Sequence, residues 1–123
     1  MGFFSRLFGN DKPQPEAAEE HALLLTFPLP NEFPSEAELH TYHALQDELT
    51  AAIEAAEAGE LDGDEFGGNQ CVIYIYGPDA DRLFDAVAPV LEKHPFPKGS
   101  TALKRYGGPD CGKSETVNLH WEG

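Results

Sequence analysis

One stretch of the sequence has the spacing of a nucleotide-binding motif. Gly107–Ser114, GGPDCGKS, satisfies the GxxxxGK[ST] pattern of a phosphate-binding loop. Such a loop must lead into a helix whose first amide N–H groups hold the phosphate. Here the following residues, TVNLHW, alternate like a strand, and only nine residues come after Ser114. We therefore interpret the motif as a Gly-Pro hairpin loop and expect no nucleotide cofactor.

A second candidate is an acidic stretch whose carboxylates could bind a hard cation such as calcium or magnesium. It contains Asp62, Asp64 and Glu65. In a calcium-binding loop the next position would be Asp or Asn, but Phe66 stands there, and Gly67 comes one residue late. The stretch also fits a bulged strand with solvated acids. We prefer the bulged strand and assign no metal.

The histidines and cysteines do not form a recognisable ligand set or catalytic pair. His40, His43 and Asp47 follow one another at successive helical turns, but zinc requires three or four ligands in a tetrahedral arrangement. Cys71 or Cys111 would need a positioned histidine base to act as a nucleophile. We expect Cys71 to pack in the core as a small hydrophobe and Cys111 to lie in a loop. The sequence assigns no catalytic residue.

The charge is high and unevenly distributed. The net charge is −14, and from Pro13 to Asp81 there are sixteen acidic residues and no Lys or Arg. Nucleic acid is an unfavourable partner, because affinity for it depends on neutralising phosphates. The pattern favours a basic protein partner or a solvated acidic face. Two isolated cysteines and the lack of a long apolar run predict a cytoplasmic protein.

Residues 1–10, MGFFSRLFGN, form a separate amphipathic segment. Four large apolar residues fall on one side at helical spacing: Phe3, Phe4, Leu7 and Phe8. Such a side could dock peripherally on a membrane surface, in a groove of a partner, or on this protein's own domain. Residues 11–20 contain two prolines and several acids and are predicted to be a linker. We expect residues 21–123 to form a single α+β domain.

The remaining periodicities predict seven elements. Ser35 and Glu38 form a capping-box pattern before the first helix, and Gly59 is its expected stop. The predicted order is a strand at 21–29, a helix at 35–58, strands at 60–68 and 71–76, a helix capped by Asp79 or Asp81, and strands at 101–106 and 115–121. This βαββαβ order with an added terminal strand predicts a ferredoxin-like sandwich, an antiparallel sheet with two helices on one face.

Tyr74 and Tyr76 alternate with the aliphatic residues of the middle strand and are therefore expected on the face away from the helices. Paired tyrosines of this kind resemble the stacking platform of an RNA-binding sheet, but the acidity of the chain opposes that function. Exposed tyrosines are equally favoured at protein interfaces. The predicted partner-binding surface consists of these two tyrosines and the acids beside them: Asp62, Asp64 and Glu65.

A longer string carries a family resemblance. The sequence DGDEFGGNQCVIYIYGPDADRLFDAVAPVL, followed by PFPKGS and KRYGGPD, resembles a group of small bacterial proteins. These proteins share an Asp-Gly-x-Glu segment, a Tyr-x-Tyr-Gly-Pro-Asp-Ala-Asp turn and a later Lys/Arg-Arg-Tyr-Gly. The likeness covers roughly the last two thirds of the chain. No established activity accompanies the group, so the resemblance implies no functional residue.

Taken together, the sequence predicts a non-catalytic, acidic interaction or regulatory module that binds a basic protein and needs no cofactor. Two alternatives remain open. One is a small enzyme or metal-binding protein that uses the loop from Asp62 to Glu65. The other is a toxin-neutralising immunity protein, whose acidity would mimic nucleic acid.

Overall fold

The computed structural model describes residues 20–108 and 112–119. The predicted segment 1–10, with its four apolar residues, lies outside this part, as do Cys111 and Trp121. The elements are β1 (His21–Pro28), α1 (Glu36–Ala56), β2 (Glu60–Gly67), β3 (Gln70–Gly77), α2 (Ala80–Leu91), β4 (Thr101–Arg105) and β5 (Ser114–Asn118). The predicted α+β class is confirmed.

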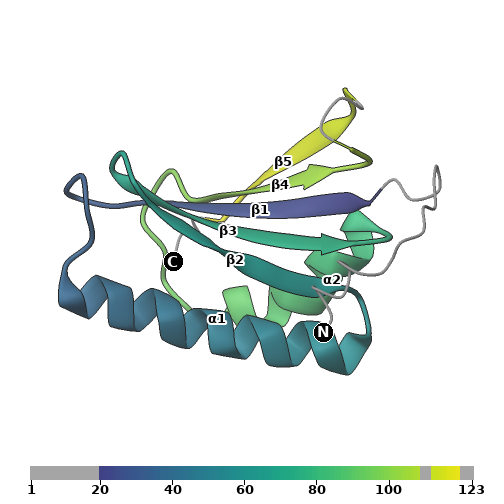
Figure 1. Ribbon diagram of the computed structural model, residues 1–123, viewed down its shortest axis with the longest axis horizontal. Coiled ribbons are helices and arrows are strands. Elements are labelled where there is room, and N and C mark those ends of the chain that lie inside the picture. Colours follow the sequence, from purple (N-terminus) through teal and green to yellow (C-terminus); the bar gives the residue numbers. More distant parts are fainter. Residues whose placement is uncertain (1–19, 109–111, 120–123) are drawn as a thin grey trace.

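The five strands form one antiparallel sheet in the order β2-β3-β1-β4-β5. β1 lies at its centre and pairs with β3 on one side and β4 on the other. Both helices lie against the same face of the sheet, and the opposite face carries neither of them (Figure 1). We call these the helix face and the open face.

The core forms between the helix face and the two helices. On β1 the side chains of Leu23, Leu25 and Phe27 are fully buried, and β3 contributes the equally buried Cys71, Ile73 and Ile75. The helices supply an apolar stripe at three- and four-residue spacing: Tyr42, Leu45, Leu49 and Ile53 from α1, and Leu83, Val87, Val90 and Leu91 from α2. Alternation in the strands and helical periodicity therefore meet in one layer.

α1 begins as predicted and ends earlier than predicted. The backbone N–H of Glu38 donates to Ser35 Oγ (3.1 Å), and the N–H of Ser35 donates to Glu38 Oε1 (2.8 Å), which completes the capping box. The expected stop at Gly59 is wrong. The helix ends at Ala56, and Glu57 caps it in the left-handed region, with φ 52°. Arg82 of α2 also donates to the carbonyl oxygen of Ala56 (2.8 Å).

β2 is a bulged strand, as its glycines suggested. Its register with β3 shifts between Leu61 and Gly63, so Asp62 is the additional residue. β2 and β3 then connect through Gly68 and Asn69, both with positive φ, which is the geometry of a tight hairpin turn. The bulge changes which acids of β2 face the helices.

Gly59 and Gly77 allow two backbone segments to approach closely. The segment after α1 crosses the end of β3 so closely that a Cβ atom on Gly77 would collide with the carbonyl oxygen of Ala58. A Cβ on Gly59 would collide with the carbonyl oxygen of Tyr76 in the same way. Two backbones in contact leave no space for a side chain, so both positions require glycine.

We therefore expect Gly77→Ala to lower the free energy of unfolding by about 1–3 kcal/mol, the usual range for an overpacked site. Gly63→Ala is the matched control, because a Cβ at Gly63 would meet no atom within 4 Å. Its effect should stay within about 0.5 kcal/mol. Urea unfolding measures both, and equal stability of the two variants would contradict the close approach.

Candidate functional site

The open face presents a continuous apolar band across the three central strands. Its middle row joins Leu24 of β1 to Tyr74 of β3 on one side and to Leu103 of β4 on the other. All three side chains are half-buried, although neither described helix covers them. A partly exposed apolar band on a sheet is typical of a surface that binds another protein.

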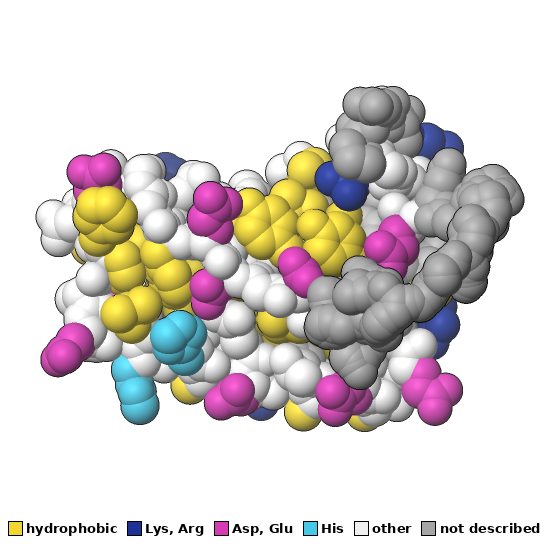
Figure 2. All heavy atoms as spheres, viewed as in Figure 1, with side chains coloured by type: hydrophobic (Ala, Val, Ile, Leu, Met, Phe, Trp, Pro, Cys, Tyr) yellow, Lys and Arg dark blue, Asp and Glu magenta, His cyan; other side chains and the backbone are white. Residues whose placement is uncertain are grey.

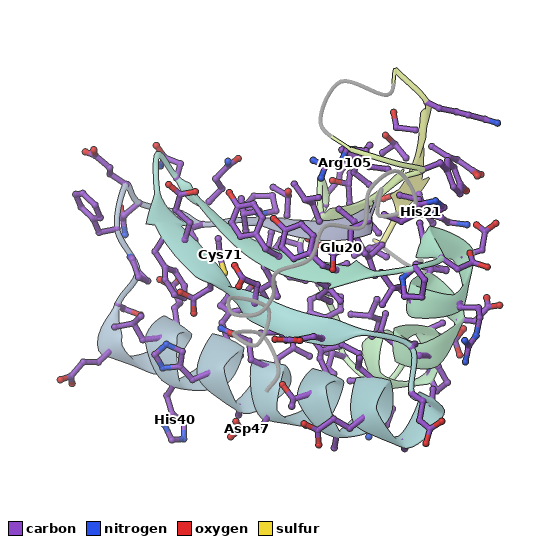
Figure 3. All side chains as sticks on the ribbon, turned by 45° about the vertical axis from the view of Figure 1, so that its right-hand side comes forward. Glu20, His21, His40, Asp47, Cys71 and Arg105 are labelled. Atoms are coloured by element: carbon purple, nitrogen blue, oxygen red, sulfur yellow. The ribbon has the colours of Figure 1, made fainter. Side chains whose placement is uncertain are left out.

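The rows on either side combine apolar and polar side chains. One row contains Val72, Thr26 and Thr101, and the other contains Tyr76, Ala22 and Arg105. In Figure 2, hydrophobic side chains gather above the strands and are bordered by acidic side chains. Figure 3 shows Arg105 above the sheet, on the side opposite α1. The band therefore ends in an acidic side toward β2 and a basic residue toward β4.

Glu65 is fixed beside the tyrosines. Tyr74 donates from its hydroxyl to Glu65 Oε1 at 2.7 Å. This hydrogen bond is the main reason that the pKa of Tyr74 is raised, because it stabilises the protonated phenol. The structure thus brings two of the predicted site residues together on the open face, with Tyr76 on the same strand face.

The other predicted acids do not join them. Asp64 accepts a hydrogen bond from Gln46 Nε2 of α1 (2.6 Å), and its carboxylate lies 3.7 Å from His43 Nε2. Its side chain therefore belongs to the helix side of β2, while that of Glu65 belongs to the open face. Asp62 occupies the bulge and is exposed. Neighbouring residues of a strand point to opposite faces, so these acids do not converge on one cation.

The candidate histidine ligands also separate. His43 faces Asp64 and packs edge-on against Phe66, with ring centroids 6.0 Å apart. His40 and Asp47 point away from the domain on the outer side of α1 (Figure 3). Within residues 20–108 and 112–119, no group of three or more His, Cys, Asp or Glu side chains could hold a metal ion. The described residues thus offer no metal centre to the loop from Asp62 to Glu65.

The phosphate-loop motif has the structure of a hairpin at the residues that can be described. The N–H of Tyr106 donates to the carbonyl oxygen of Lys113 (2.9 Å), and Ser114 is the first residue of β5. Lys113 and Ser114 lead into β5 and not into a helix, so these described residues provide no helix N-terminus for a phosphate. This agrees with the hairpin interpretation of the sequence.

Polar residues at the other end of the sheet form a network that sequence reasoning missed. The hydroxyl of Tyr106 lies 2.8 Å from Asp81 Oδ1 and 3.1 Å from Glu115 Oε1. Lys104 Nζ donates to Asp81 Oδ1 at 3.1 Å and lies 5.0 Å from the centroid of the Phe84 ring. The residues come from α2, β4, β5 and the turn after β4, and no spacing in the sequence relates them.

The first turn of α2 connects to the same network. Of the two predicted caps, Asp79 is the one that caps the helix, because its Oδ1 accepts from the N–H of Asp81 at 2.9 Å. The N–H of Ala80 donates to His21 Nδ1 (2.9 Å), and the His21 ring packs edge-on against that of Tyr106. β1, α2 and β4 are thereby held together where the chain enters the domain.

Among the hollows lined by described residues, two bear on the site. The larger, about 360 Å³, lies at the far end of β1 and is lined by Pro28, Leu29, Pro30, Glu38, Tyr42 and Pro97. The smaller, about 160 Å³, lies at the β2–β3 hairpin and includes Glu65 and Val72 of the open face. Neither contains a nucleophile paired with a base, and the smaller one extends the acidic side of the apolar band.

Comparisons with protein-family models, with curated proteins and with solved structures gave no match to this chain. In the part of the chain that the structure describes, neither helix has the length and apolar character needed to cross a membrane. The interpretation of the site therefore depends on its geometry and charge.

The burial of Cys71 predicts an unreactive thiol. Loss of hydration raises its pKa to about 12, and the nearby charge of Asp64 adds to the effect. In a Cys111→Ser variant we expect no reaction with a thiol reagent in the native state at mildly alkaline pH, and full reaction in denaturant. The absorbance of the coloured group that the reagent releases measures the reaction. Rapid labelling of the native protein would contradict the burial of Cys71.

The network predicts an acid-dependent contribution of Asp81 to stability. The hydrogen bond from Tyr106 and then that from Lys104 hold the pKa of Asp81 below its usual 3.8. A depressed pKa in the folded state stabilises the protein above pH 3.8, and that contribution disappears as the pH falls through the lowered value. Tyr106→Phe should therefore move the pKa of Asp81 back toward 3.8.

The measurement is an NMR titration of the Asp81 side-chain carboxyl carbon in the wild-type protein, in Tyr106→Phe and in Tyr74→Phe. Tyr74→Phe is the matched control, because it removes a phenol that bonds Glu65 instead. Asp81 should titrate there as in the wild type. An unchanged Asp81 titration in Tyr106→Phe would show that the phenol does not stabilise this carboxylate.

Proposed function

We propose that this protein is a non-catalytic, acidic interaction module that binds a basic protein through the open face of its sheet. The observation that supports the proposal most is the apolar row Tyr74, Leu24 and Leu103, which lies beside Glu65. Aromatic and aliphatic groups supply buried contact area, and the acidic border selects a partner of opposite charge.

The charge of the chain supports the same partner class. Acidic residues dominate from Pro13 to Asp81, and this part includes α1, β2 and β3. Such a field attracts a basic protein over a distance of about 8–10 Å at physiological ionic strength and raises the association rate. The tyrosine-centred band would then provide most of the short-range contact. The proposed location of this module is the cytoplasm.

We propose further that the domain is a ferredoxin-like sandwich extended by β5. The support is the order β2-β3-β1-β4 within the sheet and the βαββαβ order along the chain, with both helices on one face. In this arrangement β1 and β3 occupy the centre, so their alternate residues form the floor of the open face. β5 widens the face on the β4 side.

The proposal is tested by capture on the immobilised full chain, identification of the basic protein retained, and direct titration of that purified protein. We expect Tyr74→Ala and Glu65→Gln each to raise the Kd roughly tenfold, which equals about 1.4 kcal/mol. The matched control is Asp47→Asn on the outer side of α1, which removes the same charge away from the open face. Its Kd should remain within about twofold, as for a peripheral charge.

Added salt should weaken the complex, because the acidic border contributes to binding. A Kd that rises for Asp47→Asn but not for the two open-face variants would place the interface on α1 and contradict the proposal. A chain that retains no basic protein would contradict the proposed partner class itself.

A further inference from the structure

The open face lacks a cover among the described residues, and the chain itself carries a segment of matching chemistry. We propose that residues 1–10 dock on the open face of their own domain, over Leu24, Tyr74 and Leu103. The inference deepens the proposed function and rests on it in one respect: the docked segment occupies the surface that the basic partner needs. The segment is then an internal competitor of that partner.

The chemistry of the two surfaces is complementary. The segment offers one apolar side, Phe3, Phe4, Leu7 and Phe8, to a band of aromatic and aliphatic side chains. Its charged residue is Arg6, and the β2 border of the band carries Glu65. Arg105 stands on the opposite border, on the β4 strand, where it suits the acidic linker.

The dimensions also agree. Ten residues in a helix extend about 15 Å. Three adjacent strands occupy about 14 Å of sheet width. A segment of this length therefore covers β3, β1 and β4 together, which are the strands that carry the apolar band. Four large side chains at one- and three-residue steps can contact all three strands at once.

The chain enters the sheet at a favourable point. β1 is the central strand and begins at His21, and the first row of the open face lies immediately after it, at Ala22, Tyr76 and Arg105. The linker of residues 11–20 can span about 33 Å. Eight residues of β1 extend only about 26 Å. The segment can therefore return to any row of the face.

Attachment to the same chain favours this site over a separate one. A short linker holds its segment at a high effective concentration near the domain, up to the millimolar range. An isolated apolar side of this size binds a lipid surface only marginally. Docking on the open face also buries apolar groups of both surfaces in one step, so we infer intramolecular docking when no partner is present.

The test uses the full chain with Phe4→Ser and Phe8→Ser, observed by two-dimensional NMR without any partner. We expect shift changes concentrated at Leu24, Tyr74 and Leu103, and none on the outer side of α1. The matched control is Phe33→Ser in the loop after β1, because the Phe33 side chain is large, apolar and 63% exposed. It should leave the three open-face signals unchanged.

A rescue experiment follows. A synthetic peptide of residues 1–12, added to the double variant, should move the open-face signals back toward their wild-type positions, and a peptide with both serines should not. Open-face signals that are identical in the double variant and the wild type would overturn the inference.

Two other occupants have their own outcomes, and each overturns intramolecular docking. If the segment belongs to a membrane, the wild type but not the double variant will sediment with anionic lipid vesicles, and the open-face signals will be the same in both. If a second copy covers the face, those signals will depend on protein concentration and not on the two phenylalanines. Neither result affects partner binding, which the titration of Tyr74→Ala and Glu65→Gln tests separately.

Discussion

The position of β1 between β3 and β4 is the constraint on which the rest of the molecule depends. A central strand is hydrogen-bonded on both sides, so the alternation of its side chains determines which face each neighbouring residue occupies. Leu23, Leu25 and Phe27 thereby share the helix face with the apolar residues of β3. The intervening residue Leu24 is placed on the open face between Tyr74 and Leu103. A slip of one residue would exchange the core and the proposed interface.

The bulge in β2 interrupts the regular alternation of side chains, and so it changes the face on which the acids beyond it lie. The register shift after Leu61 places Asp64 on the helix side, where Gln46 donates to it, and Glu65 on the open face, where Tyr74 donates to it. One acid therefore attaches α1 to the edge of the sheet, and the other borders the apolar band. A cation site needs several oxygens directed at one point, and this arrangement directs them apart.

Most of the fold could be predicted from local patterns in the sequence. The capping box at Ser35 and the alternation around Cys71 each depend on neighbours within a few residues, and each predicted its element correctly. The prediction of a helix stop at Gly59 was wrong. Glycine is needed there because a Cβ atom would collide with the carbonyl oxygen of Tyr76, a residue distant in the sequence. The composition of the site also depends on long-range pairing. The sequence-based prediction grouped the acids of β2 because they are close in sequence, although neighbouring residues of a strand point to opposite faces.

The network around Asp81 and the apolar row of the open face hold their neighbours in different ways. At the end where the chain enters, His21, Tyr106 and Asp81 connect β1, the turn after β4 and α2 by hydrogen bonds and an edge-on ring contact. Directional bonds of this kind specify one geometry, because a hydrogen bond requires its donor and acceptor to lie at a set distance and angle. The apolar row of Leu24, Tyr74 and Leu103 imposes no such direction and tolerates different apolar partners. The network therefore fixes β1, α2 and the turn after β4 relative to one another, and the less directional open face can accept one apolar occupant in place of another.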